Sequence, residues 1–286
     1  MKISEYRFEL KKTLTDGCGK EQSEEIGELI DILLCHFLDI TRSDLYLALD
    51  NVMPVGVAVE MENAVSRLAA GVPVQYIMGS CYFRGHEIKV GNGVFIPRSD
   101  TEVLVSAAEK ALKKGGVFAD ICSGSGCISL ALADARPDSR GWALELSRSA
   151  IRYCEDNLAP YPSVTVRRFD ALDISDYTDL EEANGGPVDL VVSNPPYIPT
   201  DDIQMLDTNV LAEPETALDG GPDGLRFYRE IIKYLPIILA PDGAVCFEVG
   251  IGQSGDVSDM LSAMGFAVAV LKDLHGIERV VLGKRC

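Results

Sequence analysis

The sequence is short of basic residues. It holds 26 Lys and Arg against 44 Asp and Glu, which gives a formal net charge of -18 at pH 7. Proteins that bind duplex DNA or anionic membranes do so mainly through a basic surface. The charge therefore argues against either as the main partner, although a local basic patch is compatible with it.

Long apolar runs and closely paired cysteines are also lacking. No run reaches the roughly 18 apolar residues that cross a bilayer, and the charged N-terminus carries no apolar signal-peptide segment. Scattered cysteines without a Cys-x-x-Cys pair indicate free thiols in a reducing compartment. We therefore expect a soluble cytoplasmic protein. The cysteines are Cys18, Cys35, Cys81, Cys122, Cys127, Cys154, Cys246 and Cys286.

Histidine is scarce, and this limits the chemistry that we expect. His36, His86 and His275 lie far apart and have no metal-ligand spacing, so we predict no metal site. Cys122 and Cys127 have no histidine near them in the sequence. We therefore favour packing or backbone contacts over a nucleophilic role for these two thiols.

Three successive patterns predict two domains and a linker. In residues 1–74 apolar side chains recur at helical spacing, as in the run from Ile26 to Phe37, which predicts a small helical bundle suited to binding a partner. Residues 75–94 alternate apolar residues with glycines and predict a β-hairpin linker. Residues 95–286 form the second domain, and its first predicted helix covers residues 103–112.

From Gly115 onward strands alternate with helices, which is typical of a mostly parallel sheet. Only residues 272–278 join the last two strands, and a parallel crossover needs a dozen or more residues, so that pair must be antiparallel. The prediction is a doubly wound α/β fold with a seven-stranded sheet and an antiparallel last hairpin. The predicted strands are 117–122, 141–145, 164–169, 188–193, 244–249, 266–271 and 279–282.

The stretch Val191–Tyr197 carries the most specific signal. A β-branched run predicts a buried strand, and Pro195 and Pro196 must end it because neither can donate a ladder hydrogen bond. The residue before a proline is extended, so Asn194 is held at the carboxyl end of the strand. In open α/β sheets ligands bind at that edge.

A glycine-rich turn follows the first strand of this sheet, in Asp120-Ile121-Cys122-Ser123-Gly124-Ser125-Gly126. Such a turn lets a ligand approach the backbone and offers free N–H groups at a helix N-terminus. Glu145 ends the next strand about 20 residues later, where an acid accepts from ribose hydroxyls. Asp170 follows the third strand and suits either an exocyclic amine or a helix cap.

These positions suit S-adenosylmethionine and NAD equally well. The Asn194-Pro195-Pro196-Tyr197 segment discriminates, because hydride transfer has no need of it. The Asn194 side-chain oxygen and the Pro195 carbonyl can accept both hydrogens of a planar –NH2, and the Tyr197 ring can stack on the group that bears it. Catalysis would then be mostly positioning. A linear peptide motif and a plain strand-ending turn are the alternatives for this segment.

These two motifs together resemble the class I S-adenosylmethionine-dependent methyltransferases. Four further stretches resemble the family of bacterial release factor glutamine methyltransferases, which methylate N5 of the glutamine in the Gly-Gly-Gln motif of class 1 release factors. The resemblance covers roughly residue 40 to the end. The four stretches are residues 75–79, 95–102, 213–225 and 276–281.

The resemblance implies roles for individual residues. The methionine part of the cofactor would lie against Asp120 and the loop Cys122, Ser123, Gly124, Ser125 and Gly126. Glu145 would bind ribose, Asp170 and Ala171 would border adenine, and Phe169 would compensate for the small Ala171. Asn194, Pro195, Pro196 and Tyr197 would hold the target glutamine, with Phe95 in its pocket and Asn194 also at the cofactor. The product would be S-adenosyl-L-homocysteine, and residues 1–74 would grip the release factor, the enzyme acting as a monomer.

Three other functions remain open at this point. A ribosomal-protein glutamine methyltransferase shares both core motifs. A nucleic-acid adenine or cytosine N-methyltransferase uses the same Asn-Pro-Pro-Tyr chemistry, although the acidic composition argues against it. A regulator that binds the cofactor without catalysis would have no need of Asn194 and Tyr197.

Overall fold

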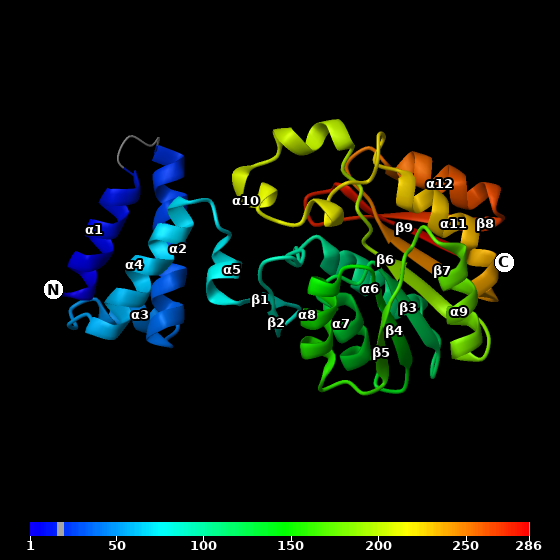
Figure 1. The fold of residues 1–286 in the computed structure, drawn as a ribbon, viewed down its shortest axis with the longest axis horizontal. Coiled ribbons are helices and arrows are strands. Elements are labelled where there is room, and N and C mark those ends of the chain that lie inside the picture. The colour runs from blue at the N-terminus through cyan, green and yellow to red at the C-terminus, as the bar shows by residue number, and fades with distance from the viewer. Residues whose placement is uncertain (16–19, 286) are drawn as a thin grey trace. The chain divides into compact units, whose positions relative to one another are not determined.

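The computed structural model describes residues 1–15 and 20–285, and the chain divides into two compact units (Figure 1). The helical unit comprises residues 1–79 together with 208–212. The sheet unit comprises residues 80–207 and the part of the chain from 213 onward. Cys18 and Cys286 lie outside the described residues, and the other six cysteines are free thiols.

Helices alone build the helical unit, as the apolar spacing predicted. Ile30, Leu33 and Leu34 form one buried stripe of α2, around which the core of this unit packs. The Thr41 side chain accepts a hydrogen bond from the Asp44 backbone N–H and so caps α3. The helices are α1 (Ile3–Thr15), α2 (Lys20–Leu38), α3 (Arg42–Ala48), α4 (Val55–Ala69), α5 (Val74–Met78) and α10 (Thr208–Leu211).

The β-hairpin occupies a shorter stretch than the glycine pattern predicted. It consists of β1 (Ser80–Phe83) and β2 (His86–Lys89), which pair antiparallel. The expectation of extended backbone from Gln75 was wrong, because this part of the chain forms α5. Pro73 precedes α5 and suits the start of a helix, and Gly79 ends it with a φ of 80°.

The sheet unit is built on a seven-stranded sheet with the order β5-β4-β3-β6-β7-β9-β8. Only β9 runs against its neighbours, pairing antiparallel with β7 and β8, so the predicted antiparallel ending is confirmed. The strands are β3 (Val117–Ile121), β4 (Arg140–Glu145), β5 (Val164–Arg168), β6 (Val188–Ser193), β7 (Leu239–Glu248), β8 (Phe266–Lys272) and β9 (Glu278–Arg285).

Helices cover both faces of this sheet (Figure 1). One layer contains α6 (Thr101–Ala111), α7 (Cys127–Ala135) and α8 (Arg148–Leu158). The other contains α9 (Ile174–Asn184), α11 (Arg226–Ile238) and α12 (Ser254–Ala263). Strands that are buried on both faces explain the near-continuous apolar runs in β3 and β6.

Two features of the chain between β5 and α11 differ from the expectation. Helix α9 was not predicted, because its sequence is rich in Asp and Glu and buries only Tyr177 and Leu180. The long loop 198–223 contains three short helical turns, at residues 200–205, 208–211 and 215–217.

Pro236 lies inside α11, and the helix ends two residues later at Ile238.

The strand order creates a crevice at the carboxyl edge of the sheet. β3 lies between β4 and β6. The chain adds β4 and β5 on one side of β3 and then crosses to the other side, where it adds β6 and β7. Ligands bind at such a switch point in open α/β sheets. Ile121 and Ser193 are paired across β3 and β6, and the Ser193 hydroxyl donates to the Ile121 carbonyl at 2.5 Å. The glycine-rich turn and Asn194 therefore begin side by side.

Candidate active site

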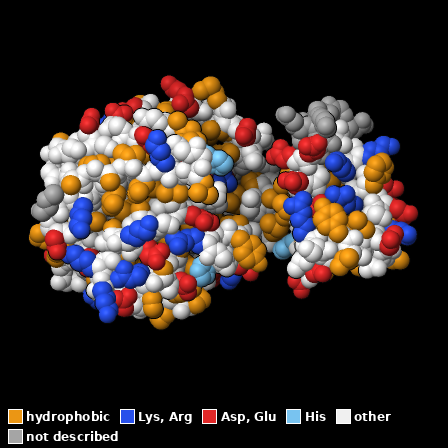
Figure 2. Space-filling model, turned by 180° about the vertical axis from the view of Figure 1, so that it is seen from behind, with side chains coloured by type: hydrophobic (Ala, Val, Ile, Leu, Met, Phe, Trp, Pro, Cys, Tyr) orange, Lys and Arg blue, Asp and Glu red, His pale blue; other side chains and the backbone are white. Residues whose placement is uncertain are grey.

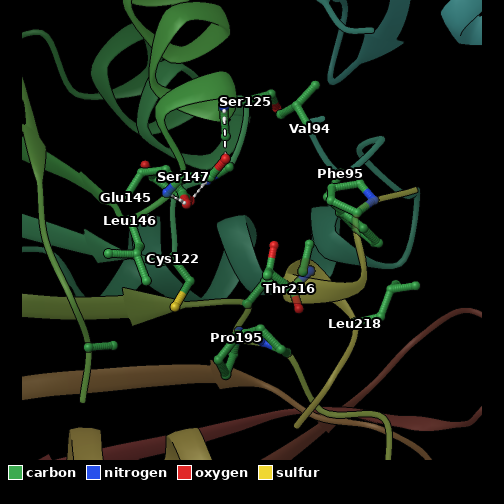
Figure 3. A pocket seen from close by; sticks show the side chains of 18 of the residues that line it. Val94, Phe95, Cys122, Ser125, Glu145, Leu146, Ser147, Pro195, Thr216 and Leu218 are labelled. Carbon is green, nitrogen blue, oxygen red and sulfur yellow. Dashed lines mark hydrogen bonds between the residues drawn. The ribbon is translucent and has the colours of Figure 1, made fainter. Parts of the chain in front are cut away.

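A cavity of about 300 Å³ opens at this switch point. Figure 3 shows Glu145, Leu146 and Cys122 on one side of the cavity and Phe95 and Leu218 on the other. Thirteen of the residues predicted for the site line it, namely Phe95, Cys122, Ser123, Gly124, Ser125, Glu145, Phe169, Asp170, Ala171, Asn194, Pro195, Pro196 and Tyr197. Asp120 and Gly126, also predicted for the site, are not among the lining residues.

Asp120 and Gly126 shape the turn beneath the cavity. Asp120 is fully buried, and its Oδ2 accepts from the Ser129 backbone N–H at 3.1 Å and from the Ser129 hydroxyl at 2.7 Å. Its Oδ1 has no hydrogen-bond partner among the described residues, and burial raises the pKa of this carboxyl to about 7. Gly126 has a φ of 78°, and a Cβ there would lie 2.8 Å from the Cys154 sulfur. Any other residue would therefore displace this turn.

Glu145 fastens the turn from the neighbouring strand. Its Oε2 accepts from the Gly124 N–H and its Oε1 from the Ser147 N–H, both at 2.8 Å. Burial raises the pKa of Glu145, and the two backbone N–H groups oppose that shift. Since each carboxylate oxygen has a second lone pair, Glu145 can still accept from ligand hydroxyls.

The chain just after β5 supplies Asp170 and Ala171 to the cavity wall. Asp170 does not cap α9, because Asp173 occupies that position and accepts from the Ser175 N–H. The Asp170 Oδ1 instead accepts from the Leu172 N–H at 2.9 Å. Tyr177 donates its hydroxyl hydrogen to the Ala171 carbonyl at 2.9 Å, which fixes the backbone beside the cavity.

Two thiols near the turn are poorly suited to nucleophilic attack. Burial raises the pKa of Cys122 well above its ordinary value and raises that of Cys154 to about 12. Since the thiolate is the nucleophile, both cysteines remain inert at neutral pH. Among residues 1–15 and 20–285, no group of three or more His, Cys, Asp or Glu side chains could hold a metal ion.

The Asn-Pro-Pro-Tyr segment is braced by the chain that follows it. The Ile198 N–H donates to the Leu218 carbonyl at 3.0 Å, and the Gly220 N–H donates back to the Ile198 carbonyl at 2.8 Å. Gly224 has a φ of 72°, and a Cβ there would lie 2.3 Å from the Tyr197 carbonyl oxygen. This close approach explains why a glycine stands at 224.

Two further braces join residues that lie far apart in the sequence. The Gln253 side chain donates from Nε2 to the carbonyls of Tyr197 at 2.9 Å and Gly224 at 3.3 Å. The buried Glu213 carboxylate accepts from the Ile96 N–H at 2.9 Å and pairs with Arg98. The Arg98 guanidinium in turn lies 5.2 Å from the centre of the Phe95 ring.

Glu213 and Arg98 therefore tie the loop at 213–218 to the segment that carries Phe95. Both partners fall in stretches that the sequence marks out, 95–102 and 213–225. Their pairing could not be deduced, because 115 residues separate them. Burial raises the pKa of Glu213, and Arg98 opposes the shift.

Comparison with known proteins identifies the family. The PrmC N-terminal domain matches residues 18–79, and the methyltransferase small domain matches residues 87–222. A release factor glutamine methyltransferase from Geobacter sulfurreducens is 38% identical over 273 residues, which cover 94% of each chain. The chain belongs to the release factor glutamine methyltransferase family. The resemblance seen in the sequence motifs is thereby confirmed.

Other members of the release factor glutamine methyltransferase family are comparably similar. One from Thermodesulfovibrio yellowstonii is 34% identical over 256 residues, which cover 87% of this chain and 89% of that one. A solved structure of a release factor-specific protein-(glutamine-N5) methyltransferase from Alicyclobacillus acidocaldarius is 31% identical. The match covers 66% of this chain and 94% of the chain in that structure, with a TM-score of 0.41.

Proposed function

We propose that this chain transfers a methyl group from S-adenosylmethionine to the side-chain amide nitrogen of the glutamine in the Gly-Gly-Gln motif of class 1 release factors. The observation that carries the proposal is the single cavity that joins the glycine-rich turn after β3 to the Asn194–Tyr197 segment after β6. One side offers backbone N–H groups and carboxylates, and the other offers carbonyl acceptors and a ring.

The first side of the cavity fits the cofactor. Gly124 has open space where a Cβ would stand, so a ligand can approach the turn closely. Glu145 lines the cavity and suits ribose hydroxyls. Phe169, Ala171 and Leu146 give the apolar surface that an adenine ring needs. When bound, S-adenosylmethionine would supply an electrophilic methyl group.

The second side fits a planar amide. The Asn194 side-chain oxygen and the Pro195 carbonyl can each accept one hydrogen of the target –NH2, which fixes the nitrogen and draws its lone pair out of conjugation. Burial raises the pKa of Tyr197 to about 12, so its ring stays neutral and can stack on the amide. Pro196 holds the turn, and Phe95 closes the pocket from the opposite wall.

The helical unit would provide the grip on the release factor, and the enzyme would act as a monomer in the cytosol, where translation takes place. On the face that Figure 2 shows, Lys and Arg are interspersed with Asp and Glu. This pattern and the net charge of -18 favour a protein substrate over a nucleic acid. No helix in the part of the chain that the structure describes is long and apolar enough to cross a membrane.

A methyl-transfer assay with labelled S-adenosylmethionine tests the proposal. The acceptors are a purified class 1 release factor, the same factor with alanine for the glutamine of its Gly-Gly-Gln motif, a ribosomal protein mixture and DNA. We expect label only in the unmodified release factor. Label in the alanine variant, in the ribosomal proteins alone or in DNA alone would contradict the proposal.

The variant Asn194→Ala separates catalysis from folding. Because it removes one of two acceptors for the target amide, we expect methyl transfer to fall about 1,000-fold. Cofactor affinity, measured by calorimetry, should change by less than about threefold, since the cofactor rests mainly on the glycine-rich turn and Glu145. A loss of folding instead would assign Asn194 a structural role.

A further inference from the structure

One buried carboxylate beside the Asn-Pro-Pro-Tyr segment has no part in the function described so far. Glu248 is the last residue of β7 and is 2% exposed. β6 and β7 run parallel with Ser193 opposite Phe247, so Asn194 and Glu248 follow side by side at the same edge. The Tyr228 hydroxyl donates to the Glu248 carbonyl at 2.7 Å and anchors this part of the strand.

The surroundings of the Glu248 side chain are mixed in polarity. Its Oε2 has no hydrogen-bond partner among the described residues. Burial raises the pKa of Glu248 to about 7, while hydrogen bonding with Thr101 and Asn194 and the charge of Arg279 oppose the shift. A buried carboxyl with spare acceptor capacity beside a polar side chain exerts a strong preference on how that side chain is oriented.

The neighbouring side chain is Asn194, whose amide has two ends of opposite polarity. Its Nδ2 donates to the Thr101 hydroxyl at 3.3 Å. Thr101 is itself 2% exposed and begins α6. With Nδ2 directed to these protein groups, Oδ1 is the end left to accept from a target –NH2.

We infer that Glu248 is a positioning residue that fixes which end of the Asn194 amide faces the acceptor. An ionised carboxylate can only accept hydrogen bonds, so it attracts Nδ2 and repels Oδ1. A protonated Glu248 can donate a hydrogen bond to Asn194 Oδ1, and the Asn194 amide can then turn around. Its Nδ2 hydrogens would face the hydrogens of the target –NH2, so no hydrogen bond could form between them. The inference rests on the proposed function, since it concerns the amide that holds the glutamine.

The tyrosines and the thiol around Glu248 do not change charge near neutral pH. Burial raises the pKa values of Tyr228 on α11 and Cys127 on α7 far above 7, and that of Tyr197 to about 12. Arg279 on β9 and Asp100 before α6 form an ion pair at 2.9 Å. Asp120 has a pKa of about 7 as well but lies on the cofactor side, so turnover must be measured at saturating cofactor.

The test compares wild type with Glu248→Gln, which keeps the shape and removes the charge. Because glutamine can donate to Oδ1, we expect kcat for the release factor to fall about 100-fold, while the dissociation constant for the cofactor changes less than twofold. Glu248→Asp keeps the charge and should retain more activity than Glu248→Gln. Glu230→Gln, in an exposed i,i+3 pair with Lys233 on α11, is the control and should turn over as wild type does.

The pH profile gives a readout that a purely structural role would not move. Wild-type kcat should fall as the pH drops through about 7, because Glu248 becomes protonated, and Glu248→Gln should lack this limb. A Glu248→Gln variant with wild-type turnover, or with the same acidic limb, overturns the inference. Failure of wild type to methylate the release factor would instead overturn the proposed function. The wild-type profile alone tests the inference if Glu248→Gln does not fold, since a flat profile between pH 6 and 8 contradicts it.

Discussion

The two halves of the cavity are held in place in different ways. On the cofactor side, Glu145 binds the turn at Gly124, only 21 residues away, and Asp120 binds Ser129, nine residues away. On the acceptor side, Asn194 meets Thr101 across 93 residues and Glu213 meets Ile96 across 117. The cofactor half is therefore a nearly local structure, and the acceptor half exists only in the complete fold of the sheet unit.

This contrast predicts where substitutions act. A change in the cofactor half should alter cofactor affinity and leave the binding of the acceptor protein intact. A change in the long-range braces of the acceptor half should weaken the binding of the acceptor protein and leave cofactor affinity intact. Two substitutions test this separation and a third tests the rigidity of the cavity wall, in order of decreasing expected effect.

The largest effect is expected for Glu145→Ala. The change removes the acceptor of the Gly124 and Ser147 N–H groups and leaves the turn without its side-chain anchor. We expect the dissociation constant for S-adenosylmethionine to rise about 10- to 100-fold, measured by calorimetry. The exposed Glu155→Ala on α8 is the control and should bind the cofactor as wild type does. Unchanged affinity in Glu145→Ala would place the cofactor elsewhere.

A smaller effect, on the other substrate, is expected for Glu213→Gln. The change weakens the tie to Arg98, so the cavity-lining residues 214 and 216–218 become less firmly held. We expect KM for the release factor to rise about tenfold in steady-state assays, with cofactor affinity unchanged. Glu215→Gln, an exposed carboxylate two residues away, is the matched control. Equal losses in affinity for both substrates would show that the two halves are not separable.

The smallest effect is expected for Tyr177→Phe. The change removes only the hydroxyl that donates to the Ala171 carbonyl, and the ring remains packed against Phe169 at 4.8 Å. The free energy of unfolding should fall by about 1 kcal/mol in urea titrations, because one buried acceptor loses its partner. Methyl transfer should stay within about twofold of wild type. A large loss of activity would mean that this wall of the cavity is less rigid than its packing indicates.

The same contrast explains how far the sequence alone could lead. The strands, the antiparallel last hairpin and the turn at 120–126 were predictable because each depends on a local pattern of apolar residues, glycines and prolines. Strand β6 ends at Ser193 because the prolines at 195 and 196 stop the ladder. The positions of Glu145 and Asn194 beside the cavity likewise followed from their places at strand ends.

What could not be predicted depends on tertiary contacts or on weak local signals. Gln253, Glu213 and Glu248 act on residues far from them in the sequence, and only the packed sheet unit brings these partners together. Helix α9 was missed because its acidic sequence shows little apolar periodicity, and its place is set by packing against α11. The hairpin boundary was wrong because the pattern of glycines did not reveal that Gly79 ends a helix.

The position of β9 within the sheet has a consequence for how the protein is made. This strand is synthesised after all the others, yet it pairs with β7 directly beside Glu248 and carries Arg279, which binds Asp100 next to α6. A growing chain on the ribosome can assemble the cofactor half early, since β3, β4 and β5 emerge first. The acceptor half must wait for β9. The ability to modify a substrate would therefore be among the last properties that the nascent protein acquires.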